Sequence, residues 1–103
     1  MSTDEPDADR VAEAALSVPG VTGLGGGAAG AVATYLPGRQ VPGVRIDDDV
    51  VSVHVTVSLD QPLLPVAASV RAAVAPLANG RAVDVVIEDV EPNTDAAGAD
   101  APG

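Results

Sequence analysis

Hydrophobic and polar residues alternate strictly over residues 51–59, and this is the clearest pattern in the chain. One side of the segment is hydrophobic: Val51, Val53, Val55, Val57 and Leu59. The other side is polar: Ser52, His54, Thr56 and Ser58. A period of two is typical of a strand with one buried face. Three aspartates precede it at residues 47–49, and aspartate tolerates turn conformations, so we predict a hairpin that joins residues 44–46 to residues 50–59.

Two segments have the hydrophobic spacing of amphipathic helices. Residues 7–18 form the first, with Asp7 or Asp9 as its amino-terminal cap. Residues 62–78 form the second, and Asn79-Gly80 ends it. The expected buried stripe of the second helix is Leu63, Val66, Val70, Val74 and Leu77. Each helix therefore has one side that must pack against another element.

The remaining extended segments are residues 21–24, residues 31–36 and a last strand that contains Val83, Val85 and Ile87. Elements with one apolar side are buried together in a two-layer arrangement. We therefore predict an α+β fold, a two-layer sandwich with two helices on one face of a small mixed sheet, in the order α-β-β-β-α-β. The strand-helix-strand step at the end of the chain allows a parallel pair by right-handed crossover.

The ordered domain is predicted to span residues 7–91. Residues 1–6 are expected to be a disordered acidic tail, and residues 92–103 a disordered tail of mainly Ala, Gly, Asp and Pro. Neither tail has the apolar residues that would offset the entropy cost of ordering.

The formal net charge is −10, from 15 acidic and 5 basic residues, and all five basic residues are scattered arginines. This charge disfavours nucleic acid and direct binding to anionic lipid. No apolar run approaches the roughly 20 residues that span a bilayer. The amino terminus lacks the basic and apolar parts of a secretory signal, and the chain has no cysteine, so we expect a cytoplasmic protein.

Gly25-x-Gly27-x-x-Gly30, followed by Asp47, matches the dinucleotide-binding fingerprint in spacing. The fingerprint requires a helix directly after the glycines, so that the phosphates meet its amino terminus. Only residues 31–36 follow before a proline, and their Val, Thr and Tyr favour a strand. We therefore interpret the glycines as a loop and predict no cofactor.

The candidates for metal binding and catalysis are similarly incomplete. The aspartates at residues 47–49 lack the spaced oxygens, glycine and closing glutamate of a calcium loop. His54 has no second His or Cys in the chain to complete a transition-metal site. Glu88 and Asp89 are adjacent in a strand and point to opposite faces, so they do not form a glycosidase pair alone. We predict no catalytic, cofactor-binding or metal site.

Two features remain that suit contact with other proteins. Arg39 and Arg45 flank a Pro-Gly turn and either bind an acidic partner or pair with acids of this chain. The sheet face opposite the helices is expected to carry Ser52, His54, Thr56, Ser58, Asp84, Val86, Glu88 and Val90. Since solvent alone does not explain Val86 and Val90, we predict that this face or a strand edge mediates assembly.

Over about four-fifths of its length the chain resembles the alkaline-shock-protein family, also called the envelope-stress-response family, and within it the short actinobacterial-type members. The resemblance lies in motifs spread along the chain: Val18-Pro19-Gly20-Val21, Ala33-Thr34-Tyr35-Leu36-Pro37-Gly38-Arg39, Val41-Pro42-Gly43-Val44 and Val83-Asp84-Val85-x-Ile87-x-Asp89-Val90. Family members often have Tyr-Gly before the second helix, where this chain has Leu59-Asp60.

The resemblance implies a non-enzymatic protein of cell-envelope homeostasis that acts through protein–protein assembly. Its partners would be a membrane-anchoring protein or related family members, and it would form homo-oligomers in some cases. The alternative from another class is a small-ligand- or metal-binding regulatory α/β domain. A bound metabolite would favour that alternative, and an integral-membrane partner would favour the assembly module.

Overall fold

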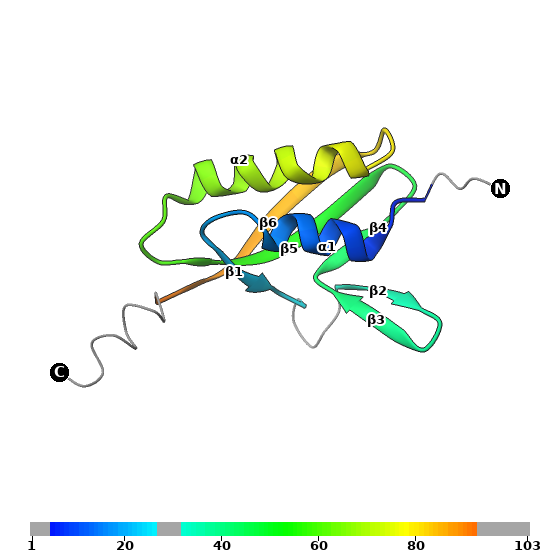
Figure 1. The fold of residues 1–103 in the computed structure, drawn as a ribbon, viewed down its shortest axis with the longest axis horizontal. Coiled ribbons are helices and arrows are strands. Elements are labelled where there is room, and N and C mark those ends of the chain that lie inside the picture. The colour runs from blue at the N-terminus through cyan, green and yellow to red at the C-terminus, as the bar shows by residue number, and fades with distance from the viewer. Residues whose placement is uncertain (1–4, 27–31, 93–103) are drawn as a thin grey trace.

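The computed structural model describes residues 5–26 and 32–92 (Figure 1). Its elements in chain order are α1 (Ala8–Leu16), β1 (Val21–Leu24), β2 (Ala33–Leu36), β3 (Arg39–Pro42), β4 (Val44–Ile46), β5 (Val50–Ser58), α2 (Leu63–Val74), the 3-10 helix η2 (Ala75–Leu77) and β6 (Ala82–Glu91). The fold class is the predicted one, an α+β fold with two α-helices and a mixed sheet.

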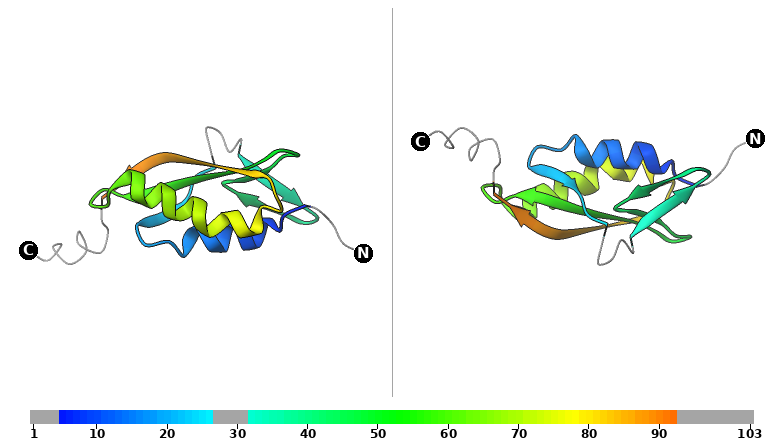
Figure 2. Two further views of the ribbon diagram at one scale, coloured as in Figure 1. Left: turned by 90° about the horizontal axis from the view of Figure 1, so that it is seen from above. Right: turned by 90° about the horizontal axis from the view of Figure 1, so that it is seen from below.

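Strand β5 is the centre of the main sheet. β6 runs parallel to β5 along one edge, from the pair Val50–Ala82 onward. β1 and β4 are antiparallel to β5 and pair with different parts of it, with Leu24 opposite Val55 and Val44 opposite Val53. Both helices lie on one face of this sheet (Figure 2), as the apolar stripes required.

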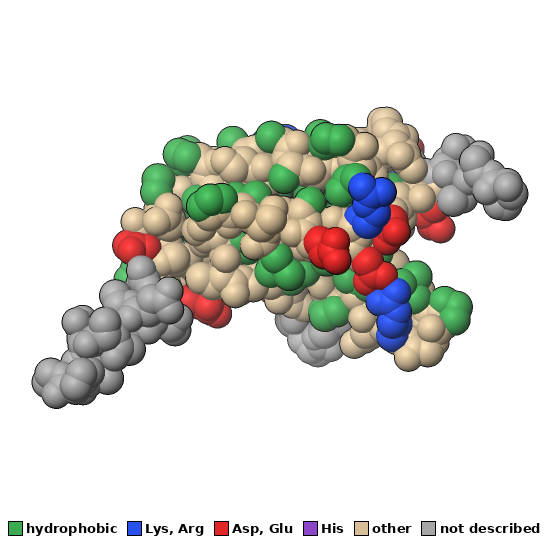
Figure 3. All heavy atoms as spheres, viewed as in Figure 1, with side chains coloured by type: hydrophobic (Ala, Val, Ile, Leu, Met, Phe, Trp, Pro, Cys, Tyr) green, Lys and Arg blue, Asp and Glu red, His purple; other side chains and the backbone are tan. Residues whose placement is uncertain are grey.

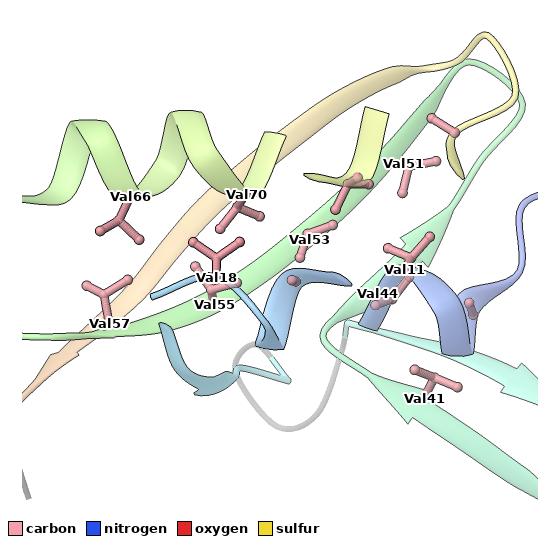
Figure 4. Packing of buried hydrophobic residues seen from close by; sticks show 14 residues of the cluster. Val11, Val18, Val41, Val44, Val51, Val53, Val55, Val57, Val66 and Val70 are labelled. Carbon is pink, nitrogen blue, oxygen red and sulfur yellow. The ribbon is translucent and has the colours of Figure 1, made fainter. Parts of the chain in front are cut away.

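The core consists mainly of valines on β5 and on the two helices (Figure 4). The four inward residues of β5 are fully buried: Val51, Val53, Val55 and Val57. Val70 and Val74 of α2 and Val11 of α1 are also fully buried against them. Each buried Val contributes roughly 1.5–3 kcal/mol relative to exposure, so the four inward valines of β5 make a large contribution to stability.

The predicted cap of α1 is present, but both α-helices end earlier than predicted, α1 at Leu16 and α2 at Val74. The Asp7 side chain caps α1 by accepting hydrogen bonds from the amides of Asp9 and Arg10. Beyond α2 the chain tightens into η2, which contains Pro76, because proline cannot continue the hydrogen bonding of an α-helix. Asn79 then has a φ of 54°, in the left-handed region that commonly ends helices.

Strands β2 and β3 form a separate hairpin beside the main sheet (Figure 1). Its turn contains Gly38, whose φ of 78° favours glycine. The Thr34 hydroxyl donates to the carbonyl of Val44 at 2.5 Å. Val41 of β3 is buried in the core cluster. These two contacts fix the hairpin to the main sheet and to α1.

The predicted order α-β-β-β-α-β contains too few strands, because five strands separate the two α-helices. The turn at Pro37-Gly38 folds residues 39–42 back onto β2, so they form β3. The parallel pair between β5 and β6 was expected as one possibility and is present.

Two leucines expected in the core are exposed instead. Leu59 is 65% exposed because β5 ends at Ser58, so the alternation does not continue to residue 59. Leu63 is 40% exposed because it is the first residue of α2, next to the exposed turn before the helix. Leu77, at the other end of the predicted stripe, packs against the core and is half-buried.

The predicted tails fall mostly outside the described residues, which exclude 1–4 and 93–103. Pro6 is buried, so packed structure begins one residue before the predicted boundary at residue 7. At the other end, β6 extends to Glu91 as expected, and Pro92 is exposed.

Candidate functional site

The sheet face opposite α1 and α2 carries an organised set of polar side chains, here called the helix-free face. It is formed by residues of β1, β5 and β6, namely Thr22, Ser52, His54, Thr56, Asp84, Val86, Glu88 and Asp89. At its centre His54 Nδ1 lies 2.7 Å from Glu88 Oε2. The side chains of His54 and Glu88 are only 19% and 22% exposed. The predicted surface histidine is therefore held by a carboxylate from the neighbouring strand.

A β-bulge interrupts β6 at Glu88. The register between β5 and β6 pairs Val55 with Ile87 and then Thr56 with Asp89, so Glu88 is the extra residue. Inserting one residue turns the following side chains to the opposite face. Val90 consequently aligns with Val57 and packs against the core. The prediction that Val90 lies on the helix-free face is wrong for this reason.

Val86 remains on the helix-free face, because it precedes the bulge and aligns with His54. It is half-buried and does not belong to the hydrophobic cluster under the helices. A half-buried valine beside a hydrogen-bonded His–Glu pair is a small apolar centre within a polar surface.

A second group of hydrogen bonds lies toward the carboxyl end of β5. The hydroxyl of Thr22 donates to Glu91 Oε1 at 2.9 Å and lies 2.8 Å from the hydroxyl of Thr56. Because each hydroxyl has one hydrogen, Thr56 is the donor to Thr22. This chain links β1, β5 and β6 across the face, which fixes the positions of its side chains.

Gly25 directly follows β1 and Gly43 directly precedes β4, and both form main-chain hydrogen bonds with His54 of β5. This junction of β1 and β4 on β5 is here called the seam. Gly25 donates its amide to the carbonyl of His54 at 2.8 Å, and the amide of His54 donates to the carbonyl of Gly43 at 2.8 Å. A Cβ at Gly25 would lie 2.1 Å from Glu88 Oε1. A side chain at position 25 would therefore displace the Glu88 carboxylate from its place beside His54.

The dinucleotide interpretation of the glycines gains no support from the structure. Gly27 and Gly30 lie outside the described residues, and the next described element is strand β2 rather than a helix. Asp47, the proposed acidic partner, lies near Arg45, with Arg45 Nε 3.6 Å from Asp47 Oδ1. Its carbonyl accepts a hydrogen bond from Arg81 Nε at 2.9 Å.

Arg39 pairs with an acid of its own chain, which was one of the two alternatives. Its guanidinium binds Asp9 of α1 with two hydrogen bonds, one of them 2.8 Å long between Arg39 Nη1 and Asp9 Oδ1. These hydrogen bonds lower the pKa of Asp9 and raise the pKa of Arg39. Acidic and basic side chains gather at this end of the molecule, where α1 begins (Figure 3).

A cleft of about 460 Å³ lies beside this ion pair, between the start of α1 and the β2–β3 hairpin. Its lining includes Asp7, Asp9, Tyr35, Arg39 and Ile46. Because Asp9 and Arg39 bind each other, a charged ligand entering this cleft would compete with their ion pair.

The described residues offer little for metal or acid–base chemistry. Within residues 5–26 and 32–92, no group of three or more His, Cys, Asp or Glu side chains is placed to hold a metal ion. In the same part of the chain no hydroxyl is hydrogen-bonded to His54. The His54–Glu88 pair therefore resembles the base and its orienting carboxylate in a catalytic triad without the nucleophile.

Alternation predicts the face of His54 and Val86 correctly. The hydrogen bond between His54 and Glu88 and the close contacts around Gly43 were not predicted. Alternation alone puts His54 and Glu88 on the same face, but their contact also depends on the parallel register that aligns Val86 with His54, which the sequence does not specify.

Comparisons with protein-family models, with curated proteins and with solved structures found no match. Among the described residues, none of the helices has the length and apolar character needed to cross a membrane.

Proposed function

We propose that this chain is a non-enzymatic protein of cell-envelope homeostasis that acts through protein–protein assembly. In this proposal it works in the cytoplasm, and an anchoring partner brings it to the membrane. The observation that carries the proposal is the helix-free face, where half-buried Val86 lies beside the bonded His54 and Glu88. Such a face has fixed side chains and a small apolar centre, as protein-binding surfaces do.

The sequence motifs that suggested this class have structural explanations that agree with the proposal. Gly20 has a φ of 98°, and a Cβ there would lie 2.9 Å from Val66 Cγ2. Gly43 has a φ of 83° and lies at the seam beside His54. At both positions the backbone angle and the close contacts favour glycine, so these parts of the motifs have a structural rather than a catalytic reason.

The test compares wild type with Val86→Glu by size exclusion and light scattering. Ala72→Glu on the exposed side of α2 is the control, because it adds the same charge to the opposite layer. We expect concentration-dependent assembly, or a stable complex with an identified membrane protein after crosslinking in source cells. The Val86→Glu variant should lose the assembly or complex that wild type shows, and the Ala72→Glu variant should retain it. A strictly monomeric wild type whose crosslinked partners are unchanged by Val86→Glu would refute the proposal.

A small-ligand-binding regulatory domain is the second candidate, and the observation that favours it is the cleft beside Arg39. Native mass spectrometry of the protein purified from source cells tests it. A bound small molecule that is absent from the Arg39→Gln variant would support this candidate over assembly.

A further inference from the structure

Strand β6 forms an edge of the main sheet. It pairs with β5 on one side, and no other strand of the described residues pairs with it. Viewed from above, β6 runs along the rim of the sheet (Figure 2, left). An edge strand presents main-chain donors and acceptors that can pair with another extended segment.

The hydrogen bonds at the ends of β6 show which of its main-chain groups face outward. The amide of Ala82 donates to the carbonyl of Asp49, so Ala82 faces β5. Because main-chain groups alternate along a strand, those of Val83, Val85 and Ile87 face away from β5. Their side chains pack against the core, so an approaching segment meets their backbone.

Both ends of this outer edge are already capped by side chains. Arg71 Nε of α2 donates to the carbonyl of Val83 at 3.3 Å. Beyond the bulge, the amide of Val90 donates to Asp89 Oδ1 at 2.8 Å. The outward groups of Val85 and Ile87 lie between these caps, and no strand in the described part of the chain covers them. The open stretch therefore suits a short segment.

The charges beside this stretch select the partner. Asp84 and Asp89 are exposed on β6, and the strand contains no basic residue. An antiparallel second copy centred on Val86 would place Asp84 opposite Glu88, and like charges in that position are destabilising. Lysine or arginine at alternate positions of a partner strand would face the acidic residues instead.

We infer that the edge of β6 binds a short extended segment of a partner protein that carries basic residues at alternate positions. This inference rests on the proposed function as a protein-binding module and specifies where and what the module binds. The main-chain groups of Val85 and Ile87 supply the affinity, and Asp84 and Asp89 supply the charge selectivity.

A seven-residue peptide of alternating lysine and valine, with blocked ends, is the probe. Two matched peptides are the controls: one with glutamate in place of lysine, and one methylated on alternate backbone nitrogens. Amide NMR spectra and hydrogen exchange are measured on the full chain. We expect the lysine peptide to slow exchange of the Val85 and Ile87 amides and to bind at least about tenfold more tightly than either control, since each lost pairing weakens strand addition.

The variant arm combines Asp84→Lys and Asp89→Lys, with Glu13→Lys on the exposed side of α1 as the charge control. The β6 double variant should bind the lysine peptide about tenfold more weakly, while Glu13→Lys binds it as the wild type does. Amide spectra establish that the variants are folded. The inference would be overturned if the methylated peptide bound as tightly as the lysine peptide. It would also be overturned if Glu13→Lys weakened binding of the lysine peptide as much as the β6 double variant does.

Three further outcomes separate this inference from the proposed function. If the protein assembles through Val86 but the peptide leaves the Val85 and Ile87 amides unchanged, the edge inference is wrong and the proposed function stands. If those amides become protected with rising protein concentration and no peptide, a second copy occupies the edge, and the inference of a basic partner is wrong. If the lysine peptide protects the Val85 and Ile87 amides while Val86→Glu leaves assembly unchanged, the edge inference holds and the role of the helix-free face in the proposed function is wrong.

Discussion

Replacing Gly43 with alanine should be far more damaging than the same change at Gly38, although the two glycines have nearly equal backbone angles. Their φ values are 83° and 78°, so alanine meets the same conformational penalty of about 1 kcal/mol at each position. Only Gly43 is enclosed. A Cβ there would lie 2.7 Å from Leu24 Cβ and 3.0 Å from the carbonyl oxygen of Gly25, whereas nothing lies within 4 Å at Gly38.

Relief of the contacts at Gly43 requires movement of the main chain at Leu24 and Gly25, where β1 ends, because the close atoms are a Cβ and a carbonyl oxygen. Overpacking of this kind costs roughly 1–3 kcal/mol in addition to the conformational penalty. In a domain of this size 1 kcal/mol corresponds to about 4–8 °C in the unfolding midpoint. Thermal unfolding followed by circular dichroism should give a fall of about 5 °C for Gly38→Ala and about 15 °C or more for Gly43→Ala.

Amide exchange adds a local measurement to this comparison. The hydrogen bonds from Gly25 to His54 and from His54 to Gly43 form the seam, so exchange of both amides should accelerate in Gly43→Ala and stay unchanged in Gly38→Ala. Equal melting points for the two variants would refute the role assigned to Gly43 and show that the seam adapts without cost.

Three other changes test separate parts of the structure. Val55→Asp places an unpaired charge at a fully buried position, which costs several kcal/mol and should abolish the folded circular dichroism spectrum; a folded variant would contradict the core assignment. Hydrogen bonds from Arg39 lower the pKa of Asp9, so their pair stabilises the fold above about pH 4 and this contribution disappears as the pH falls through the folded-state pKa. Wild type should therefore melt above Arg39→Gln at pH 7 and converge with it near about pH 2; a constant difference would exclude the ion pair as the cause. Deleting residues 92–103, which lack large apolar residues, should leave the melting point unchanged, and a fall of about 5 °C would show that this segment packs on the domain.

The parts of the fold that were predictable from sequence are those governed by a repeating pattern. The alternation in β5 identified four buried valines because the period of a strand leaves only two ways to orient it. The helical spacing of Val66, Val70 and Val74 likewise selected the buried side of α2. Where the pattern ended, prediction failed: Leu59 continues the alternation in sequence but follows the last residue of β5.

The features of the candidate site depend on single residues that break a pattern. Val90 continues the alternation of Val86 and Glu88 in sequence, yet the bulge at Glu88 turns it into the core. No local sequence signal marks this extra residue, because bulges are set by how two strands align. The same alignment brings the Glu88 carboxylate over Gly25 and onto His54, two contacts between residues distant in sequence.

The bulge also connects the two surfaces for which a binding role is proposed. Glu88, the extra residue of the bulge, lies beside His54 on the helix-free face, and Asp89, which follows it, caps the outward amide of Val90. Bulges and charged side chains are common means of preventing an edge strand from pairing indiscriminately. In β6 both occur near the carboxyl end, while Val85 and Ile87 stay uncovered by any described strand. An edge that is protected at its ends and open in its middle limits both the length and the charge of a strand that can add to it.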